Sequence, residues 1–210
     1  MSRNGIIVAI SGGSGTGKST AVKKLAAHYG GVALLEGEEH DLPERIRQDI
    51  ASGERQLELM VYFQNKILDT YLKAMEEKKN GKLVFLDTFW PTNEVYIEHW
   101  MKEPFEKQII KDLSRIHGEL LPWPDVVFCL QSDADRLREF IRSRGRKFEL
   151  EDPAVLDRFV STARFHDEYF KQFSDVVFFD RSKMDFENES DFRSLTEVMD
   201  RELRIHNWPI

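Results

Sequence analysis

A glycine-rich segment between an apolar run and a helical pattern limits the folds open to this chain more than any other feature. Residues 12–19 read GGSGTGKS and match the pattern G-x-x-x-x-G-K-[S/T] in full. Glycines let successive backbone N–H groups point inward as a nest for anions, and the following helix adds the positive end of its dipole. The apolar run GIIVAI (5–10) precedes the loop, and STAVKKLAAHYG follows it as a helix. The segment therefore predicts a phosphate-binding loop that joins a buried strand to a helix.

The loop supplies the candidate residues for binding ATP and Mg²⁺. In loops of this pattern the lysine, here Lys18, reaches the β- and γ-phosphates, and the hydroxyl of Ser19 is a ligand for Mg²⁺. A dinucleotide-binding fingerprint is excluded, because Lys18 stands where its third glycine belongs. The candidate cofactor-binding residues, which include one arginine from a later basic segment, are Gly12, Gly13, Ser14, Gly15, Thr16, Gly17, Lys18, Ser19, Thr20 and Arg142.

Short apolar runs alternate with helical patterns along the rest of the chain. The runs are continuous and rich in Val, Ile and Phe, which is typical of strands buried on both faces of a parallel sheet. They lie at 5–10, 31–35, 82–86, 125–130 and 175–179, and the helices are predicted at 17–29, 43–52, 55–79, 93–117, 133–143, 153–173 and 190–205. This alternation predicts one α/β domain over residues 1–210, with a five-stranded parallel sheet and helices on both of its faces.

The composition argues against several classes of protein and several kinds of binding partner. The formal net charge of −7 argues against a chain-wide attraction to nucleic acid or to an anionic membrane surface. No apolar run approaches the 18 to 20 or so residues of a membrane span. The single cysteine, Cys129, excludes an intramolecular disulfide, and a reducing, cytoplasmic location is the default expectation. Positive charge must therefore gather locally if the chain binds polyphosphates.

The polar residues that follow the strands narrow the class of phosphate-loop protein. In open α/β sheets, ligands bind outside the carboxyl ends of the strands. Asp87 follows the third run and suits a Mg²⁺ ligand, but it is followed by Thr88, so the glutamate that activates water in motor ATPases is missing there. No Asn-Lys-x-Asp element for guanine has the right spacing and place. These absences favour a kinase for nucleotides or other small molecules.

Three further features suit an acceptor site and a lid. Glu36 follows the second strand and could take the proton of an acceptor hydroxyl, although a solvated acid is an equal alternative. Gln64 falls on the apolar stripe of 55–79, with Phe63 beside it; it could pair with a nucleobase, or be satisfied by the backbone around it. Arg142, Arg144 and Arg146 surround Gly145 and could clamp phosphates, the alternative being a basic helix end.

Together these residues resemble the deoxyribonucleoside kinase family over about residues 5 to 180. The resemblance rests on the phosphate loop, Glu36, the Phe63-Gln64 pair, Asp87 and the segment 144–149, which reads RGRKFE. It implies that Glu36 is the general base, that Gln64 pairs with the base of a nucleoside and that Asp87 serves magnesium. It also implies a lid over about 142–152, in which Arg144 and Arg146 hold ATP phosphates and Glu149 contacts the sugar.

The chain departs from the family in its acceptor region. The family follows its third strand with an acid–Arg–Ser triplet, whereas this chain has Asp87-Thr88-Phe89, so another cation, such as Arg115 or Arg164, would have to replace the arginine. The family tyrosine that touches the sugar is replaced by Gly53. The expected activity is transfer of the ATP γ-phosphate to a hydroxyl of a neutral or cationic acceptor, with a nucleoside favoured.

Other functions and assemblies remain open. The acceptor could instead be a nucleoside monophosphate or another small metabolite. The chain could also be a nucleotide-binding regulatory module with little catalysis. The unusual segment 87–96 (DTFWPTNEVY) is the reason to retain this alternative. A homodimer through the long helices 55–79 or 93–117 is open as well.

Overall fold

A five-stranded parallel sheet forms the centre of the computed structural model, which describes residues 4–37, 41–150 and 152–209. The strands are β1 (Ile6–Gly12), β2 (Val32–Leu35), β3 (Leu83–Asp87), β4 (Val126–Gln131) and β5 (Val176–Asp180). Their order across the sheet is β2-β3-β1-β4-β5, and all neighbouring pairs are parallel. The predicted sheet is therefore confirmed, and every strand lies within two residues of its predicted bounds.

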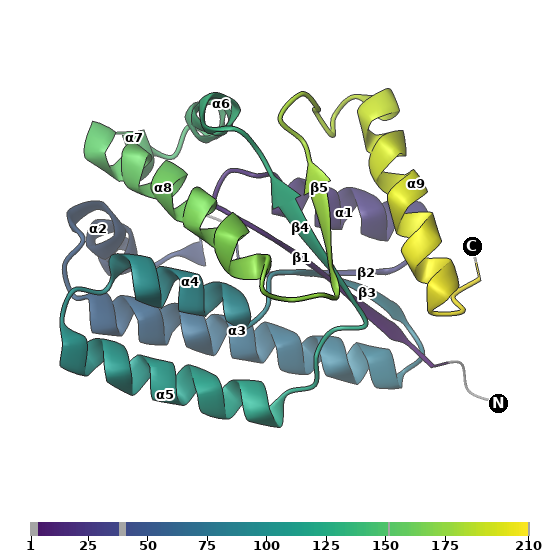
Figure 1. Ribbon diagram of the computed structural model, residues 1–210, viewed down its shortest axis with the longest axis horizontal. Coiled ribbons are helices and arrows are strands. Elements are labelled where there is room, and N and C mark those ends of the chain that lie inside the picture. The colour runs from purple at the N-terminus through teal and green to yellow at the C-terminus, as the bar shows by residue number, and fades with distance from the viewer. Residues whose placement is uncertain (1–3, 38–40, 151, 210) are drawn as a thin grey trace.

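Helices cover both faces of this sheet (Figure 1). One face packs against α1 (Lys18–Tyr29) and α9 (Glu189–Ile205), through a core that includes Val8 and Phe128. The other face packs against α3 (Gln56–Lys79) and α8 (Pro153–Phe170), through a core that includes Ala9 and Val127. Successive side chains of a strand point to opposite faces, so a run that is apolar throughout supplies both cores.

The remaining helices form a second layer beyond the carboxyl ends of the strands. They are α2 (Glu44–Ser52), α4 (Pro91–Trp100), α5 (Pro104–Leu120), α6 (Ala134–Arg144) and α7 (Lys147–Leu150). Their apolar side chains form a third cluster with α3 and α8, in which Trp100 and Phe159 are central examples. This cluster contains no strand residue among those described, so the helices build a wall beside the sheet edge where ligands bind.

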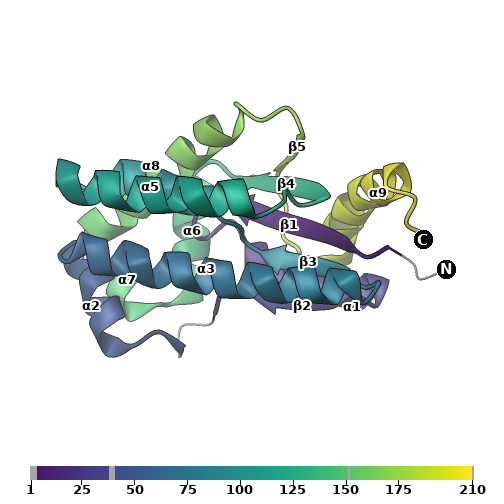
Figure 2. The ribbon, with the colours of Figure 1, turned by 90° about the horizontal axis from the view of Figure 1, so that it is seen from below.

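One predicted helix is wrong, because 93–117 forms two helices instead of one. Met101, Lys102 and Glu103 separate α4 from α5, and Pro104 opens α5. Proline has no amide hydrogen to donate and pushes the preceding residue out of the helical region, and Glu103 is indeed extended, with φ −77° and ψ 114°. The break lets α5 turn back and run beside α3, as Figure 2 shows. None of the helices in the described ranges is both long and apolar enough to cross a bilayer.

Candidate active site

The phosphate loop runs from the end of β1 into α1 and is packed tightly from behind. A side chain at Gly13 would collide with Ala163 on α8, and one at Gly17 would collide with the guanidinium of Arg181. Gly17 also has φ 83°, a left-handed conformation that favours glycine. Arg181 Nη1 donates a hydrogen bond to the Thr16 carbonyl oxygen at 2.7 Å. The loop is therefore held in place before any phosphate binds, as a preformed anion site requires.

Lys18 and Ser19 stand at the start of α1, where the phosphates of ATP would bind. Lys18 Nζ donates to the Gly13 carbonyl oxygen at 3.2 Å, so its ammonium lies folded over the loop. Ser19 Oγ donates to Asp87 Oδ2 at 2.5 Å. The other carboxylate oxygen of Asp87 is buried and has no hydrogen-bond partner. A buried, unpaired oxygen beside a serine hydroxyl is a donor set that suits Mg²⁺, so these residues fit the metal expected from the sequence.

Glu36 lies next to Asp87 because of the sheet register. Leu35 pairs with Asp87 across β2 and β3, and Glu36 is the next residue. Its carboxyl group is half-buried, and burial, followed by the negative charge of Asp87, raises its pKa from 4.5 to about 7. The cations Lys18, Arg146 and Lys66 oppose this rise. A carboxylate that titrates near neutral pH is well suited to accept a proton at that pH.

A pocket with about 1080 Å³ of empty space, solvent at its mouth included, opens in front of these residues. The charged and polar residues that line it include Lys18, Ser19, Glu36, Asp87 and Glu149. Its apolar walls come from α2, α3, α4, α7 and α8. The apolar and aromatic residues of the lining are Leu42, Ile50, Leu59, Met60, Tyr62, Phe63, Ile67, Tyr96, Trp100, Phe148 and Phe159. An apolar chamber with a few convergent polar groups is the usual form of a small-molecule site.

The basic segment after β4 reaches into the same pocket. Arg144 Nη2 lies 2.6 Å and 2.7 Å from the two carboxylate oxygens of Glu149, and it also donates to Ser14 Oγ at 3.0 Å. Arg146 Nη1 lies 3.5 Å from Glu149 Oε1. Gly145 separates the two arginines in the left-handed region, with φ 72°. Arg144 thus connects the phosphate loop to Glu149, whose side chain is almost completely buried.

Gln64 is not brought to this pocket. Its amide nitrogen lies 3.1 Å from His117 Nδ1 on α5, and its Oε1 accepts a hydrogen bond from Asn93 at 3.4 Å. The side chains of α3 that line the pocket are at 59, 60, 62, 63, 66 and 67, so Gln64 lies just beyond the margin of that face. Phe63 does line the pocket, as expected. The geometry therefore favours a glutamine whose hydrogen bonds are satisfied within the protein, although its partners are side chains and not the backbone that the sequence suggested.

Three other arginines considered from the sequence lie outside the pocket. Arg142 is exposed, Arg115 is exposed and pairs with Glu119, and Arg164 is exposed on α8. None of them is among the lining residues; besides Lys18 and Arg146, the cation that acts on Glu36 is Lys66 of α3. The helical repeat explains this, because Lys66 follows Phe63 by three residues and shares its face of the helix.

Helix α4 contributes residues that the sequence did not single out. Thr92, Asn93, Tyr96 and Trp100 line the pocket; Tyr96 follows the first two by four and three residues and precedes Trp100 by four, which places them on one face of α4. Burial raises the pKa of Tyr96, and so do the negative charges of Glu36, Glu149 and Asp87, so its hydroxyl stays protonated. The sequence did mark part of this region, since the segment 87–96 is unusual. That its residues line a pocket follows only from the start of α4 at Pro91, directly beyond β3.

Known protein families and structures show what the chain as a whole is similar to. Residues 7–151, more than half of the 210, match the AAA domain family. The chain belongs to the AAA domain family. This AAA domain is 26% identical over 188 residues to a uridine kinase of Macrococcus caseolyticus, covering 81% of this chain and 86% of that protein. It is 24% identical over 213 residues to a deoxyadenosine kinase of Lactobacillus acidophilus, covering 94% and 96%.

Solved structures place the fold of this AAA domain among the P-loop kinases. A deoxyadenosine kinase from M. mycoides, with dCMP and a flexible dCDP as bound products, superimposes with a TM-score of 0.71 at 19% identity, covering 95% of this chain and 99% of that one. The same enzyme with bound dATP gives 0.71 at 18% identity, covering 93% and 99%. The P-loop kinase fold and the resemblance to deoxyribonucleoside kinases are thus confirmed.

Proposed function

We propose that this protein transfers the γ-phosphate of ATP to a hydroxyl of a nucleoside. The observation that carries the proposal is Glu36, a carboxylate with a pKa of about 7, beside Lys18 and Asp87 at the polar end of an apolar pocket. The names of the relatives, uridine kinase and deoxyadenosine kinase, support a nucleoside as the acceptor.

In this proposal each polar residue of the pocket has one role. Glu36 accepts the proton of the acceptor hydroxyl as its oxygen attacks phosphorus. The N–H groups of residues 13–19 and the Lys18 ammonium bind the β- and γ-phosphates. Ser19 and Asp87 hold Mg²⁺, which supplies charge neutralisation for the phosphates. Asp87 also raises the pKa of Glu36, so its presence makes Glu36 a stronger base.

The acceptor is held by two groups of residues in the proposal. The sugar hydroxyls contact the carboxylate of Glu149 and the hydroxyl of Tyr96, because both line the pocket together with Glu36. The base lies between aromatic side chains such as Phe63 and Trp100, where stacking is worth about 1–3 kcal/mol. Asn93, held through its amide nitrogen by Gln64, is the buried amide that can contact the edge of the base.

The segment 142–152 acts as a lid in the proposal. Arg144 already bridges Ser14 and Glu149, so closure over ATP would bring its guanidinium to the phosphates while it stays connected to the acceptor side. Arg146 stabilises the transferring charge from the same side. Residues 1–210 function as a single kinase domain in this view, and the cytoplasm remains the predicted location.

A panel of acceptors tests the proposal. Nucleosides, deoxynucleosides, nucleoside monophosphates and sugars are incubated with ATP labelled at the γ-phosphate, and labelled products are separated. We expect a nucleoside to be phosphorylated by the wild type and by Glu54→Gln, an exposed control, but not by Glu36→Gln, which should still bind ATP. Turnover by Glu36→Gln at the wild-type rate would contradict the assignment of the base.

One observation favours a second acceptor class. Lys66 and Arg146 both lie close enough to Glu36 to lower its pKa, so cations face the acceptor end of the pocket. They could bind the phosphate of a nucleoside monophosphate, which the same panel includes. If only the monophosphates are labelled, the acceptor is a nucleoside monophosphate and the nucleoside proposal is wrong. Labelling of no compound would favour a nucleotide-binding regulatory module.

The proposal also includes a homodimer formed through α5 and α3. Large apolar side chains are exposed along one side of α5, at Phe105, Ile109, Ile116 and Leu120, and Leu72 is exposed on the adjacent α3. Figure 2 shows the two helices lying side by side at the surface. Light scattering should give the mass of two chains for the wild type and for the control Ile205→Glu, and of one chain for Phe105→Glu. A monomeric wild type would contradict this part of the proposal.

A further inference from the structure

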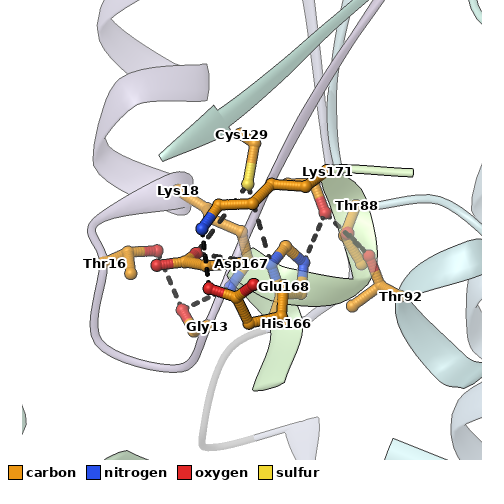
Figure 3. Close-up of polar contacts among 11 residues, drawn as sticks. Gly13, Thr16, Lys18, Thr88, Thr92, Cys129, His166, Asp167, Glu168 and Lys171 are labelled. Carbon is orange, nitrogen blue, oxygen red and sulfur yellow. Dashed lines mark hydrogen bonds and ion pairs between the residues drawn. The ribbon is translucent and has the colours of Figure 1, made fainter. Parts of the chain in front are cut away.

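Beside the phosphate loop, three side chains from β4 and α8 that are not part of the pocket lining converge. Cys129 of β4 and His166 of α8 are fully buried, and Asp167 of α8 is partly exposed. The Cys129 sulfur lies 3.7 Å from His166 Nδ1 and 4.0 Å from Asp167 Oδ1, and these two atoms are 3.9 Å apart. Figure 3 shows the three groups directed toward one another, close to Lys18 and Gly13.

We propose that Cys129 Sγ, His166 Nδ1 and Asp167 Oδ1 form a binding site for Zn²⁺. An ion at the centre of a triangle with these sides would lie about 2.2 Å from each atom, against about 2.3 Å for zinc–sulfur and 2.0–2.2 Å for zinc–nitrogen and zinc–oxygen bonds. The thiol of Cys129 has one hydrogen and can donate it either to His166 or to Asp167, whereas a metal ion would bind all three side chains at once. Thiolate, imidazole and carboxylate are the ligand types that zinc takes in proteins.

The surroundings of His166 fix the nitrogen that would bind the metal. Its Nε2 lies 2.9 Å from Ser11 Oγ, which in turn lies 2.8 Å from Thr92 Oγ1. Ser11 and Cys129 are paired across β1 and β4, so the imidazole reaches both strands, with Nε2 toward one and Nδ1 toward the other. The ring stacks on Phe170 with centroids 4.3 Å apart. A hydrogen bond on the second nitrogen is the usual support of a metal-binding histidine.

Charge and access are consistent with a divalent ion at this place. The thiol of Cys129 loses its proton to solvent as the sulfur–zinc bond forms, so thiolate and carboxylate together balance the two positive charges of the ion. Lys18 faces the cluster from the phosphate loop, and Lys171 pairs with Glu168 at its outer edge. The partly exposed Asp167 leaves a side open for entry and for water as a fourth ligand.

Cobalt provides a test that needs no mutation, because Cys129 is the only cysteine in the chain. The full-length protein is purified with a chelator, dialysed and titrated with Co²⁺ and then Zn²⁺. We expect an ultraviolet thiolate-to-cobalt charge-transfer band that saturates at about one Co²⁺ per chain and disappears as Zn²⁺ replaces it. Absence of the band, or metal binding without it, would overturn the proposal, since no other residue could supply the thiolate.

Variants then test the individual ligands by competition against a zinc indicator. Cys129→Ser and Asp167→Asn should weaken zinc binding at least tenfold, and Ser11→Ala about tenfold, because it acts through His166. The control His99→Gln, which removes an exposed histidine on α4, should bind zinc as the wild type does. Circular dichroism checks that each variant is folded. Equal zinc affinity in the wild type and in folded Asp167→Asn would also overturn the site.

Discussion

Replacing Glu36 with glutamine should make the protein more stable at neutral pH while removing the proposed base. The pKa of Glu36 is raised from 4.5 to about 7 in the folded protein, first by burial and then by Asp87. Between these two values the folded state binds more protons than the unfolded state, so the free energy of unfolding of the wild type falls as pH rises. Glutamine carries no charge and avoids this loss.

The size of the effect follows from the shift. At about 1.4 kcal/mol per pKa unit, ionising Glu36 in the folded state costs at most about 3 kcal/mol, and we expect about 2 kcal/mol because the side chain is only half-buried. Relative to the wild type, Glu36→Gln should gain stability between pH 4.5 and 7 and keep a constant advantage above pH 7.

Urea unfolding measured at several pH values tests this expectation. The free energies of the wild type, Glu36→Gln and the exposed control Glu54→Gln are compared from pH 4.5 to 8. The control should follow the wild type throughout. A difference between Glu36→Gln and the wild type that does not grow from pH 4.5 to 7 would refute the argument that burial and Asp87 hold the pKa near 7.

Three further predictions concern the proposed reaction. The kcat/KM for the acceptor should rise with pH and level off above about pH 7, because Glu36 must be ionised, and a profile flat from pH 5.5 to 8 would exclude this role. Asp87→Asn should lower kcat by about 10²–10³ and raise the Mg²⁺ concentration needed for half-maximal rate, whereas unchanged Mg²⁺ dependence would remove Asp87 from the metal site. Tyr96→Phe should raise the KM of the acceptor about three- to tenfold with the KM of ATP unchanged, as expected for one lost hydrogen bond; equal changes in both constants would argue against sugar contact.

The local patterns of the sequence predicted the sheet and the phosphate loop well. Each strand is a short apolar run bounded by polar residues, and each such run can bury both of its faces only inside a covered parallel sheet. The loop pattern needs only a strand before it and a helix after it, and both are neighbours in the chain. The individual strands and the loop depend on patterns among neighbouring residues, which the sequence displays directly.

Helix faces and helix ends were harder to predict. Gln64 and Phe63 are adjacent in sequence, yet only Phe63 lines the pocket, because a step of one residue turns about 100° around the helix. The break before Pro104 was missed because the apolar spacing on either side continues across it. Arg115 and Arg164 were considered as replacements for the arginine missing after Asp87, but neither lines the pocket, whereas Lys66 of α3 does.

Sequence alone determined that the chain contains a phosphate loop and the strands of a parallel sheet, and that with a net charge of −7 it must gather positive charge locally to bind a polyphosphate. Tertiary structure alone decided which charges meet: Lys18, Lys66, Arg144 and Arg146 gather in one pocket although up to 128 residues separate them. It likewise brought Cys129 to His166 and Asp167. The physical reason is that parallel strands end at a common edge, so residues distant in the chain become neighbours only when the sheet has formed.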